Sequence, residues 1–133
     1  MRILTLAFLA FTTLTACRGD DATNPTVAVV GTYTLQQVNG GPLPFTVQTG
    51  DPKIEIISEQ LTVAAGGSYT VTTMFRHTTG GVASTNPTTD TGTYTISGTT
   101  LAFHDSGGDV GSAMIGTNTL TFQEDGVTLL FVK

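Results

Sequence analysis

The sequence has a single cysteine among its 133 residues, so no disulfide can form within the chain. Basic side chains are also few. Five lysine and arginine residues stand against ten acidic ones, and the net charge of −5 disfavours a surface for nucleic acid or anionic lipid. Long apolar runs are missing too: the uncharged stretch at residues 3–14 has twelve residues, whereas a membrane-spanning helix needs about 20. Stability must therefore come from an apolar core and from backbone hydrogen bonds.

The start of the chain has the features of a secretory signal, because the basic Arg2 precedes this short uncharged stretch. The tetrad Leu14-Thr15-Ala16-Cys17 that follows resembles the lipobox of bacterial lipoproteins. Small side chains at positions 15 and 16 would admit the signal peptidase, and the thiol of Cys17 would take the lipid, with palmitate among its acyl chains. The alternatives are an ordinary signal peptide with an incidental cysteine, or a buried cysteine in a cytosolic protein.

Three segments are expected from this reading: a helical signal peptide at residues 1–16, the acylated Cys17 with a flexible tether at residues 17–29, and one folded domain at residues 30–133. Residues 18–26, "RGDDATNPT", are polar and lack apolar periodicity, which is typical of a tether. By resemblance to proteobacterial sorting, Arg18 beside the cysteine favours the outer membrane. The expected location is the bacterial cell envelope, with contact to the membrane through the N-terminal lipid.

Composition predicts an all-β domain. Threonine accounts for 28 residues and glycine for 16, while lysine, arginine, leucine and alanine are sparse for a helical protein. Threonine is β-branched and favours strands. From Gly31 onward apolar residues alternate with polar ones. This pattern predicts eight strands, near residues 31–38, 53–64, 68–78, 91–97, 99–104, 109–116, 118–123 and 126–133.

The same alternation predicts which side chains face inward. They are Tyr33, Leu35, Ile54, Ile56, Leu61, Val63, Tyr69, Val71, Phe75, Tyr94, Ile96, Leu101, Phe103, Leu120, Phe122, Val127, Leu129 and Phe131. In the second strand the apolar parity changes from even to odd, which predicts a β-bulge within residues 57–60. In the sixth strand two sets compete for the inner face: Val110, Ser112 and Met114, or Gly111, Ala113 and Ile115.

An internal repeat predicts how the strands connect. "ISGTTLAFHDSG" from Ile96 and "IGTNTLTFQEDG" from Ile115 align at an offset of 19 residues. Each unit reads as a strand, a tight turn, a second strand and another turn. Repeated hairpins indicate an antiparallel up-and-down meander, which can close into a small barrel and so remove its exposed edges. The alternative is an open sandwich.

Two connections are long. Residues 39–52 include the apolar Leu43, Phe45 and Val47, so this segment is expected to fold over one end of the barrel. Residues 79–90, "TGGVASTNPTTD", have little to bury and are expected to form a mobile loop.

The residues "GTYT" at 31–34, followed by the long segment at residues 39–52, resemble the lipocalin-like (calycin-type) small β-barrels. In that family a Gly-x-Trp lies near the closed end of the barrel, and a long loop covers the open mouth. Tyr33 stands at the place of the tryptophan. The resemblance also implies that a basic residue on the last strand packs across this ring, and Lys133 is in phase to do so. About 100 residues resemble uncharacterised bacterial lipoproteins that carry such a domain.

An eight-stranded barrel can be filled by side chains or can hold one small ligand. If a pocket is present, the resemblance and the inward pattern point to aromatic ligand-binding residues: Tyr33, Phe45, Tyr69, Phe75 and Tyr94. No enzyme is expected. Of the two histidines, His77 is predicted to face inward and His104 outward, which separates them as a catalytic or metal pair. Asp105 and Asp109 flank a glycine turn but lack the ligands of a calcium loop. No catalytic residue, metal or cofactor is predicted.

Three functions remain open at this stage. The first is a lipid-anchored envelope protein whose lipocalin-like barrel binds or carries a small apolar ligand. The second is a structural or protein-interaction module with a solid core and no ligand, for which Leu130 and Val132 at outward positions are a hint. The third is an inhibitor of an envelope hydrolase, which no specific residue supports.

Overall fold

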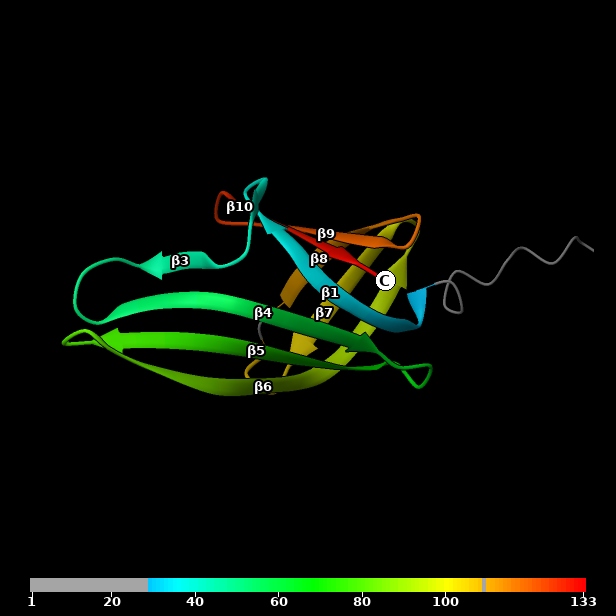
Figure 1. Ribbon diagram of the computed structural model, residues 1–133. Coiled ribbons are helices and arrows are strands. Elements are labelled where there is room, and N and C mark those ends of the chain that lie inside the picture. The colour runs from blue at the N-terminus through cyan, green and yellow to red at the C-terminus, as the bar shows by residue number, and fades with distance from the viewer. Residues whose placement is uncertain (1–28, 109) are drawn as a thin grey trace, which may run out of the picture.

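Eight antiparallel strands form a meander that closes on itself into a barrel (Figure 1). The computed structural model describes residues 29–108 and 110–133. β1 pairs with β10 on one side and with β4 on the other, which joins the two ends of the sheet. The predicted eight-stranded meander and its closure are therefore confirmed, and the open sandwich is wrong. The barrel strands are β1 (Gly31–Val38), β4 (Lys53–Val63), β5 (Ser68–Thr79), β6 (Val82–Ser97), β7 (Thr100–Asp105), β8 (Val110–Gly116), β9 (Thr119–Glu124) and β10 (Val127–Val132).

The connection between β1 and β4 contains two further short strands, β2 (Gly41–Pro42) and β3 (Phe45–Gln48). β2 pairs with the end of β1, and β3 pairs with the first half of β4. Leu43 and Phe45 pack against the apolar core, whereas Val47 is largely exposed. The expected signal-peptide helix, Cys17 and residues 18–28 of the tether lie outside the described residues. Within the described ranges, no helix is long and apolar enough to span a bilayer.

Burial follows the predicted alternation. Directly paired residues such as Tyr33 and Leu61, or Leu35 and Phe131, place their side chains on the same inner face. In β8 the odd-numbered set faces inward, because Ala113 is buried while Met114 is 63% exposed. Val127 was predicted to be inward, but it lies at the rim of the barrel and is 38% exposed. The buried apolar core comprises Val29, Tyr33, Leu35, Val38, Leu61, Val63, Tyr69, Tyr94, Leu101, Phe103, Ala113, Leu120 and Phe131.

The predicted β-bulge lies at Ile57. Ile56 pairs with Phe75 and Ser58 pairs with Met74, so Ile57 has no opposite residue on β5. The extra residue explains why apolar side chains change parity along β4. It lies at the point where β4 passes from a projecting hairpin into the barrel wall.

Residues 79–90 do not form the mobile loop that was predicted. β5 and β6 pair without interruption as far as Thr79 and Val82, and Gly80 and Gly81 make the turn with φ angles of 55° and 79°. Two consecutive positive φ angles are typical of a tight hairpin turn, which glycine adopts without strain. The threonines around Pro87 favour an extended chain, and this preference outweighs the loop signal of the asparagine and proline.

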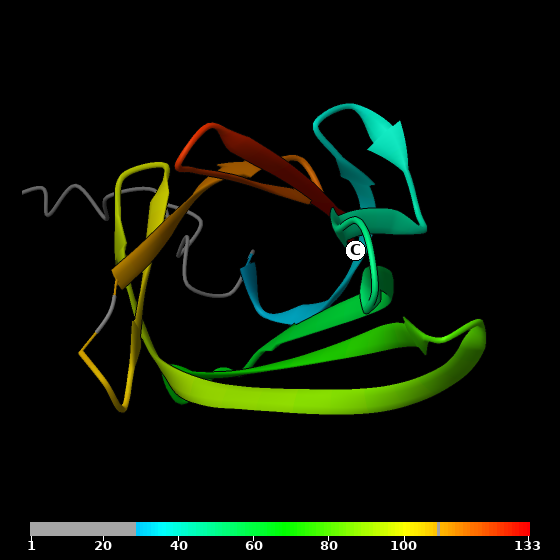
Figure 2. The same cartoon turned by 90° about the vertical axis from the view of Figure 1, so that its left-hand side faces the viewer.

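We name the projecting part of the sheet the ribbon: residues 53–57 of β4, 73–79 of β5 and 82–90 of β6, with β3 alongside β4. It extends beyond the barrel because β7 pairs with β6 only from Gly92 to Ser97 (Figures 1 and 2). Residues 82–91 of β6 are all exposed and have no strand on their second side. Pro87 lies in this free edge and lacks an N–H group, which hinders the addition of another strand.

An ion triad joins β4 and β5 on the face of the ribbon opposite to Ile54 and Ile56. The Glu55 carboxylate is 2.8 Å from the ammonium of Lys53 and 2.8 Å from the guanidinium of Arg76, whose Nε also donates to it at 2.9 Å. These hydrogen bonds lower the pKa of Glu55. Its side chain is only 7% exposed because its two partners cover it.

The closed end of the barrel is held by Tyr33. Its hydroxyl donates a hydrogen bond of 2.9 Å to the carbonyl oxygen of Val29, which is buried. The ammonium of Lys133 lies 5.7 Å from the centre of the Tyr33 ring and also donates to the carbonyl oxygen of Val30. The predicted contact between Lys133 and Tyr33 is thus confirmed. A small eight-stranded antiparallel barrel with this arrangement is consistent with a lipocalin-like fold.

Candidate functional site

The opposite, open end of the barrel holds a cavity of about 430 Å³. Small-molecule sites have volumes of about 300–1,000 Å³. The space at the open end, next to the ribbon, is thus large enough for a small ligand, whereas core side chains fill the closed end. The lining comes from the inner faces of β4 to β9: Glu59, Leu61, Tyr69, Val71, Thr73, Asp90, Phe103, Asp105, Gly111, Phe122 and Glu124.

Aromatic rings form the floor of this cavity. Phe103 lies edge-on to Tyr69, with 4.9 Å between ring centres and an angle of 88°. It also stacks on Phe122 at 5.2 Å and 29°, and Phe122 contacts Phe131 at 5.3 Å. Phe103 and Phe122 occupy equivalent positions in the internal repeat, so the repeat itself places two phenyl rings side by side.

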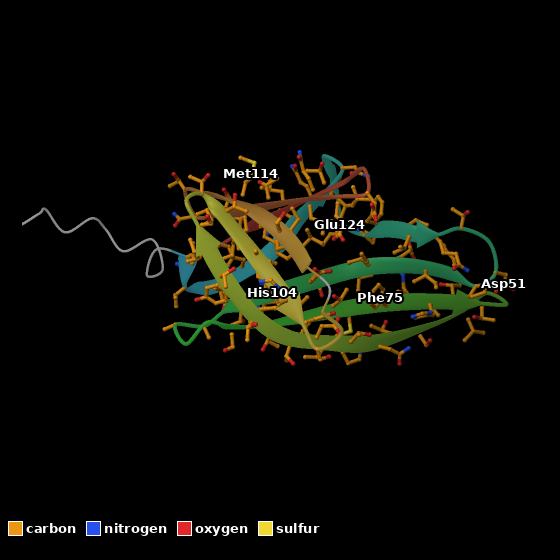
Figure 3. The ribbon with its side chains drawn as sticks, turned by 180° about the vertical axis from the view of Figure 1, so that it is seen from behind. Asp51, Phe75, His104, Met114 and Glu124 are labelled. Atoms are coloured by element: carbon orange, nitrogen blue, oxygen red, sulfur yellow. The ribbon has the colours of Figure 1, made fainter. Side chains whose placement is uncertain are left out.

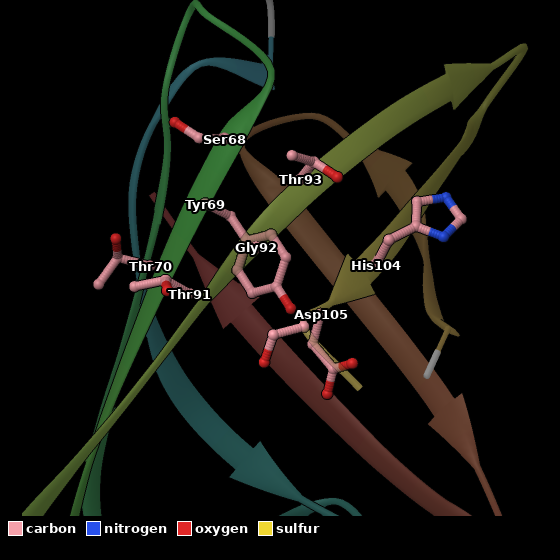
Figure 4. Close-up of a pocket in the computed structure, with 9 residues that line it drawn as sticks. Ser68, Tyr69, Thr70, Thr91, Gly92, Thr93, His104 and Asp105 are labelled. Carbon is pink, nitrogen blue, oxygen red and sulfur yellow. The ribbon is translucent and has the colours of Figure 1, made fainter. Parts of the chain in front are cut away.

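Two glycines leave room for the site. Gly92 pairs with both Tyr69 and Asp105. A Cβ at Gly92 would lie 2.7 Å from a ring carbon of Tyr69, so only glycine lets this ring lie directly against the β6 backbone. Figure 4 shows the Tyr69 ring against Gly92, with its hydroxyl directed toward Asp105. A Cβ at Gly111 would lie 3.9 Å from the Glu124 carboxylate, inside the cavity.

Four carboxylates face the cavity: Glu59, Asp90, Asp105 and Glu124. Among residues 29–108 and 110–133, no lysine or arginine lines it. Glu59 accepts a hydrogen bond of 3.1 Å from the hydroxyl of Thr73, a residue that is 7% exposed. Burial, together with the charge of Asp90, raises the pKa of Glu59. Burial, followed by the charges of Asp105 and Asp90, likewise raises the pKa of Tyr69.

A second hollow, of about 410 Å³, adjoins the cavity along the ribbon. We name it the shelf. Its lining residues are Val47, Gln48, Ile54, Phe75, His77 and Thr88. The shelf and the cavity share one face of the sheet, because Phe75 follows the cavity residue Thr73 by two positions on β5. Side chains two residues apart on a strand point the same way and are about 7 Å apart. Figure 3 shows Glu124 at the open end of the barrel and Phe75 further out on the ribbon.

Another depression, of about 580 Å³, is a weaker candidate. It lies across the outer wall at β5, β6 and β7, where serine and threonine side chains surround Gly92 (Figure 4). It is more open to solvent than the cavity, so a small molecule would bury less of its surface there.

The predicted ligand-binding residues lie in different parts of the structure. Tyr69 lines the cavity and Phe75 lines the shelf. Phe45 packs against the core from β3, opposite Ile56. Tyr33 and Tyr94 belong to the closed end, where the hydroxyl of Tyr94 donates to the carbonyl oxygen of Ala64 at 2.6 Å. Tyr69 and Phe75 thus lie toward the open end, whereas Tyr33 and Tyr94 lie at the closed end of the same inner face.

The four cavity carboxylates and Phe103 and Phe122 were not predicted as site residues. Strand parity could have indicated the acids, since Glu59 is in phase with Leu61, and Asp105 with Phe103. The repeat gives a second signal, because Glu124 stands 19 residues after Asp105. Both acids directly continue the inward pattern beyond an aromatic residue.

The histidines lie on opposite faces, as strand parity predicts: His77 lines the shelf and His104 lines the outer depression. Among residues 29–108 and 110–133, no three histidine, cysteine or acidic side chains are grouped so that they could hold one metal ion. Asp105 accepts a hydrogen bond of 2.8 Å from the backbone N–H of Gly107 in the glycine turn.

No protein family, curated protein or solved structure matches this chain.

Proposed function

We propose that this protein binds a small molecule with an apolar body at the open end of its barrel and holds or carries it at the bacterial cell envelope. The observation that supports the proposal is the cavity of about 430 Å³ above the rings of Tyr69, Phe103 and Phe122. Tyr69 and Phe103 are largely buried, and the partly buried ring of Phe122 offers apolar area in a concave site that a ligand can cover. No chemical step is proposed, and the role is binding rather than catalysis.

The test uses the chain from residue 18 to residue 133, which retains every strand of the closed sheet. A neutral dye whose emission rises in apolar surroundings, N-phenyl-naphthylamine, is titrated into it, and native mass spectrometry is used to look for a ligand that co-purifies. Saturable binding of the dye at one site supports the proposal.

A matched pair of variants locates the site. Gly111→Leu fills the cavity and should weaken dye binding about tenfold or more, because the added side chain takes the volume of the ligand. Ser112→Leu adds the same side chain to the same strand on its outer face and should leave the affinity within about twofold. Absence of saturable binding would favour the alternative of an interaction module without a ligand. Equal binding by both variants would contradict the cavity as the binding site.

We also propose that the protein is tied to the membrane through lipid on Cys17, at the outer membrane if Arg18 acts as a sorting residue. The support is the tetrad at positions 14–17 with the short uncharged stretch before it. Cells that express the full chain are fed an alkyne analogue of palmitate. The wild-type protein should be labelled and should sediment with membranes, and Cys17→Ser should lose the label. Labelling of Cys17→Ser at the wild-type level would contradict the anchor.

A further inference from the structure

The chemical class of the ligand can be narrowed from the charge, the ring faces and the shape of the site. We propose that the cavity selects an organic cation: an ammonium group on an alkyl chain, with the nitrogen in the cavity and the chain along the shelf. This inference rests on the proposed function, since it presumes that the open end binds a small molecule.

The orientation of the carboxylates is imposed by the strand register. Asp90 pairs with Val71, and Asp105 pairs with Gly92 opposite Tyr69, so both occupy inward positions of the ladder. Glu59 pairs with the buried Thr73. Glu124, opposite Val127, completes the set from β9. Four strands thus each supply one acidic side chain to one cavity, which also contains no basic side chain.

Like charges around one cavity repel one another, and the cost is largest at Glu59, which is partly buried while Asp90, Asp105 and Glu124 are exposed. Burial is the main cause of the raised pKa of Glu59, and the charge of Asp90 adds to it. A bound cation would stabilise the charged form of Glu59 against both effects. The site thus favours positive charge over neutral or negative ligands of the same shape.

The aromatic rings at the floor of the cavity also favour a positively charged ligand, independently of the acids. The face of a phenyl or phenol ring carries negative electrostatic potential and attracts ammonium groups. Tyr69, Phe103 and Phe122 all line the cavity that the carboxylates surround. Rings with carboxylates form a site for a cation that carries apolar groups, since methyl or methylene groups can contact the rings while the charge faces the acids.

The shelf extends the site in one direction. The apolar side chains of Ile54, Phe75 and Val47 lie beyond the acidic cavity, on the same sheet face. Val47 is 55% exposed, and Phe75 is only half-buried. An alkyl chain that leaves the cavity along β5 would cover these side chains, so the chain length of the ligand should affect its affinity.

The experiment compares three probes of equal chain length and different charge: decyltrimethylammonium, decanol and decanoate, all below the concentration at which they form micelles. The affinity of each probe for residues 18–133 is measured by its displacement of the neutral dye. We expect the cation to bind at least tenfold more tightly than the alcohol, and the carboxylate to bind more weakly than the alcohol. High salt should reduce the preference for the cation.

Single substitutions that remove one charge test the assignment. Glu59→Gln and Asp90→Asn should each weaken binding of the cation about five- to thirtyfold. The affinity for decanol should stay within about twofold of the wild-type value. Asp51→Asn is the matched control, because it removes the same charge at the tip of the ribbon, where Asp51 accepts the backbone N–H of Gly80 (Figure 3). Phe75→Ala should weaken the binding of decyltrimethylammonium but not that of tetramethylammonium, which has no alkyl chain to cover the shelf.

Circular dichroism confirms that each variant is folded before binding is measured. Equal affinity for the three probes, or preference for decanoate, overturns the proposal that the ligand is a cation and leaves the proposed binding function intact. Failure of all three probes and of the dye to bind overturns both proposals. Loss of cation binding in Asp51→Asn to the same degree as in Asp90→Asn also overturns the assignment, because it would reflect net charge alone.

Discussion

At the scale of single residues, Glu59 is a cavity side chain whose burial as a charged group lowers stability. Its pKa is raised by burial and by Asp90. In the unfolded chain the carboxyl loses its proton near pH 4.5, whereas the folded protein retains it to higher pH. The folded state therefore loses stability relative to the unfolded state as pH rises from 4.5 through the folded pKa. Functional sites often carry such a cost.

The prediction is that Glu59→Gln raises the melting temperature at pH 7, by about a few degrees. The amide keeps an oxygen for the Thr73 hydroxyl but carries no charge. The gain should disappear well below pH 4.5, where the wild-type side chain is protonated in both states. Thermal unfolding followed by circular dichroism at both pH values checks this. A lower melting temperature of the variant at pH 7 would show that the charged form is stabilising and would contradict the account.

Gly31 has a different role, at the closed end. Its φ angle of 150° is one that other residues rarely adopt, and a Cβ there would overlap the side chain of Lys133. Glycine therefore lets Lys133 cross the backbone to reach the ring of Tyr33. This explains in physical terms why a glycine precedes the aromatic residue by two positions at the start of β1.

We predict that Gly31→Ala lowers the free energy of unfolding by about 1–3 kcal/mol, because it strains the backbone and displaces Lys133. Gly66→Ala is the control. A Cβ at Gly66 would meet no atom within 4 Å, and we expect a change of less than about 0.5 kcal/mol. Urea unfolding measures both. Equal effects of the two substitutions would remove the argument for a specific fit at Gly31.

At the scale of elements, the ribbon depends on contacts between neighbouring strands because little of it is buried. The triad of Lys53, Glu55 and Arg76 joins β4 to β5 across the ribbon. The pKa of Glu55 is lowered by these partners. Its contribution to stability is therefore present above the unfolded value of 4.5 and is lost as pH falls through the folded pKa.

Replacement of Glu55 by glutamine should loosen the ribbon without opening the barrel. We expect faster amide hydrogen exchange in residues 53–57 and 73–79, and unchanged exchange in β9 and β10. Lowering the pH should increase the opening of the ribbon in the wild type, after correction for the intrinsic pH dependence of exchange, and the variant should lack this increase. Uniform acceleration across all strands would mean that the ribbon and the barrel open as one unit.

At the scale of the whole molecule, unequal strand lengths create the open end. β4, β5 and β6 have 11, 12 and 16 residues, whereas β7 to β10 have six or seven. The long strands continue past the short ones as the ribbon. The core can then close one end of the barrel and leave a cavity at the other, lined by the buried Phe103 and the partly buried Phe122.

Much of this fold could be predicted from the sequence because side chains alternate strictly along a strand. That rule indicated the inner face, the bulge in β4 and the hairpins of the repeat. It also placed Lys133 in phase with Phe131, while the contact of Lys133 with Tyr33 was implied by the resemblance to lipocalin-like barrels. Closure followed from one apolar face on eight consecutive strands.

The site was harder to predict because it depends on where each inward residue lies along the barrel axis. Tyr33 and Tyr69 have the same inward parity, yet the first is at the closed end and the second lines the cavity. Glu59 and Asp90 also have inward parity, but acidic residues near strand ends usually face solvent. Asn86 and Pro87 suggested a loop and concealed the length of β6. These features depend on the relative offset of all eight strands, which no local pattern encodes.

The most direct test of the central claim is a proton–nitrogen NMR titration of residues 18–133 with decyltrimethylammonium. We predict shifts of the amides of Thr73, Gly92, Phe103, Gly111 and Phe122, while the amides of Tyr33 and Tyr94 at the closed end stay unchanged. Shifts confined to the closed end or to the outer wall, or no shifts at saturating probe, would contradict a ligand site at the open end of the barrel.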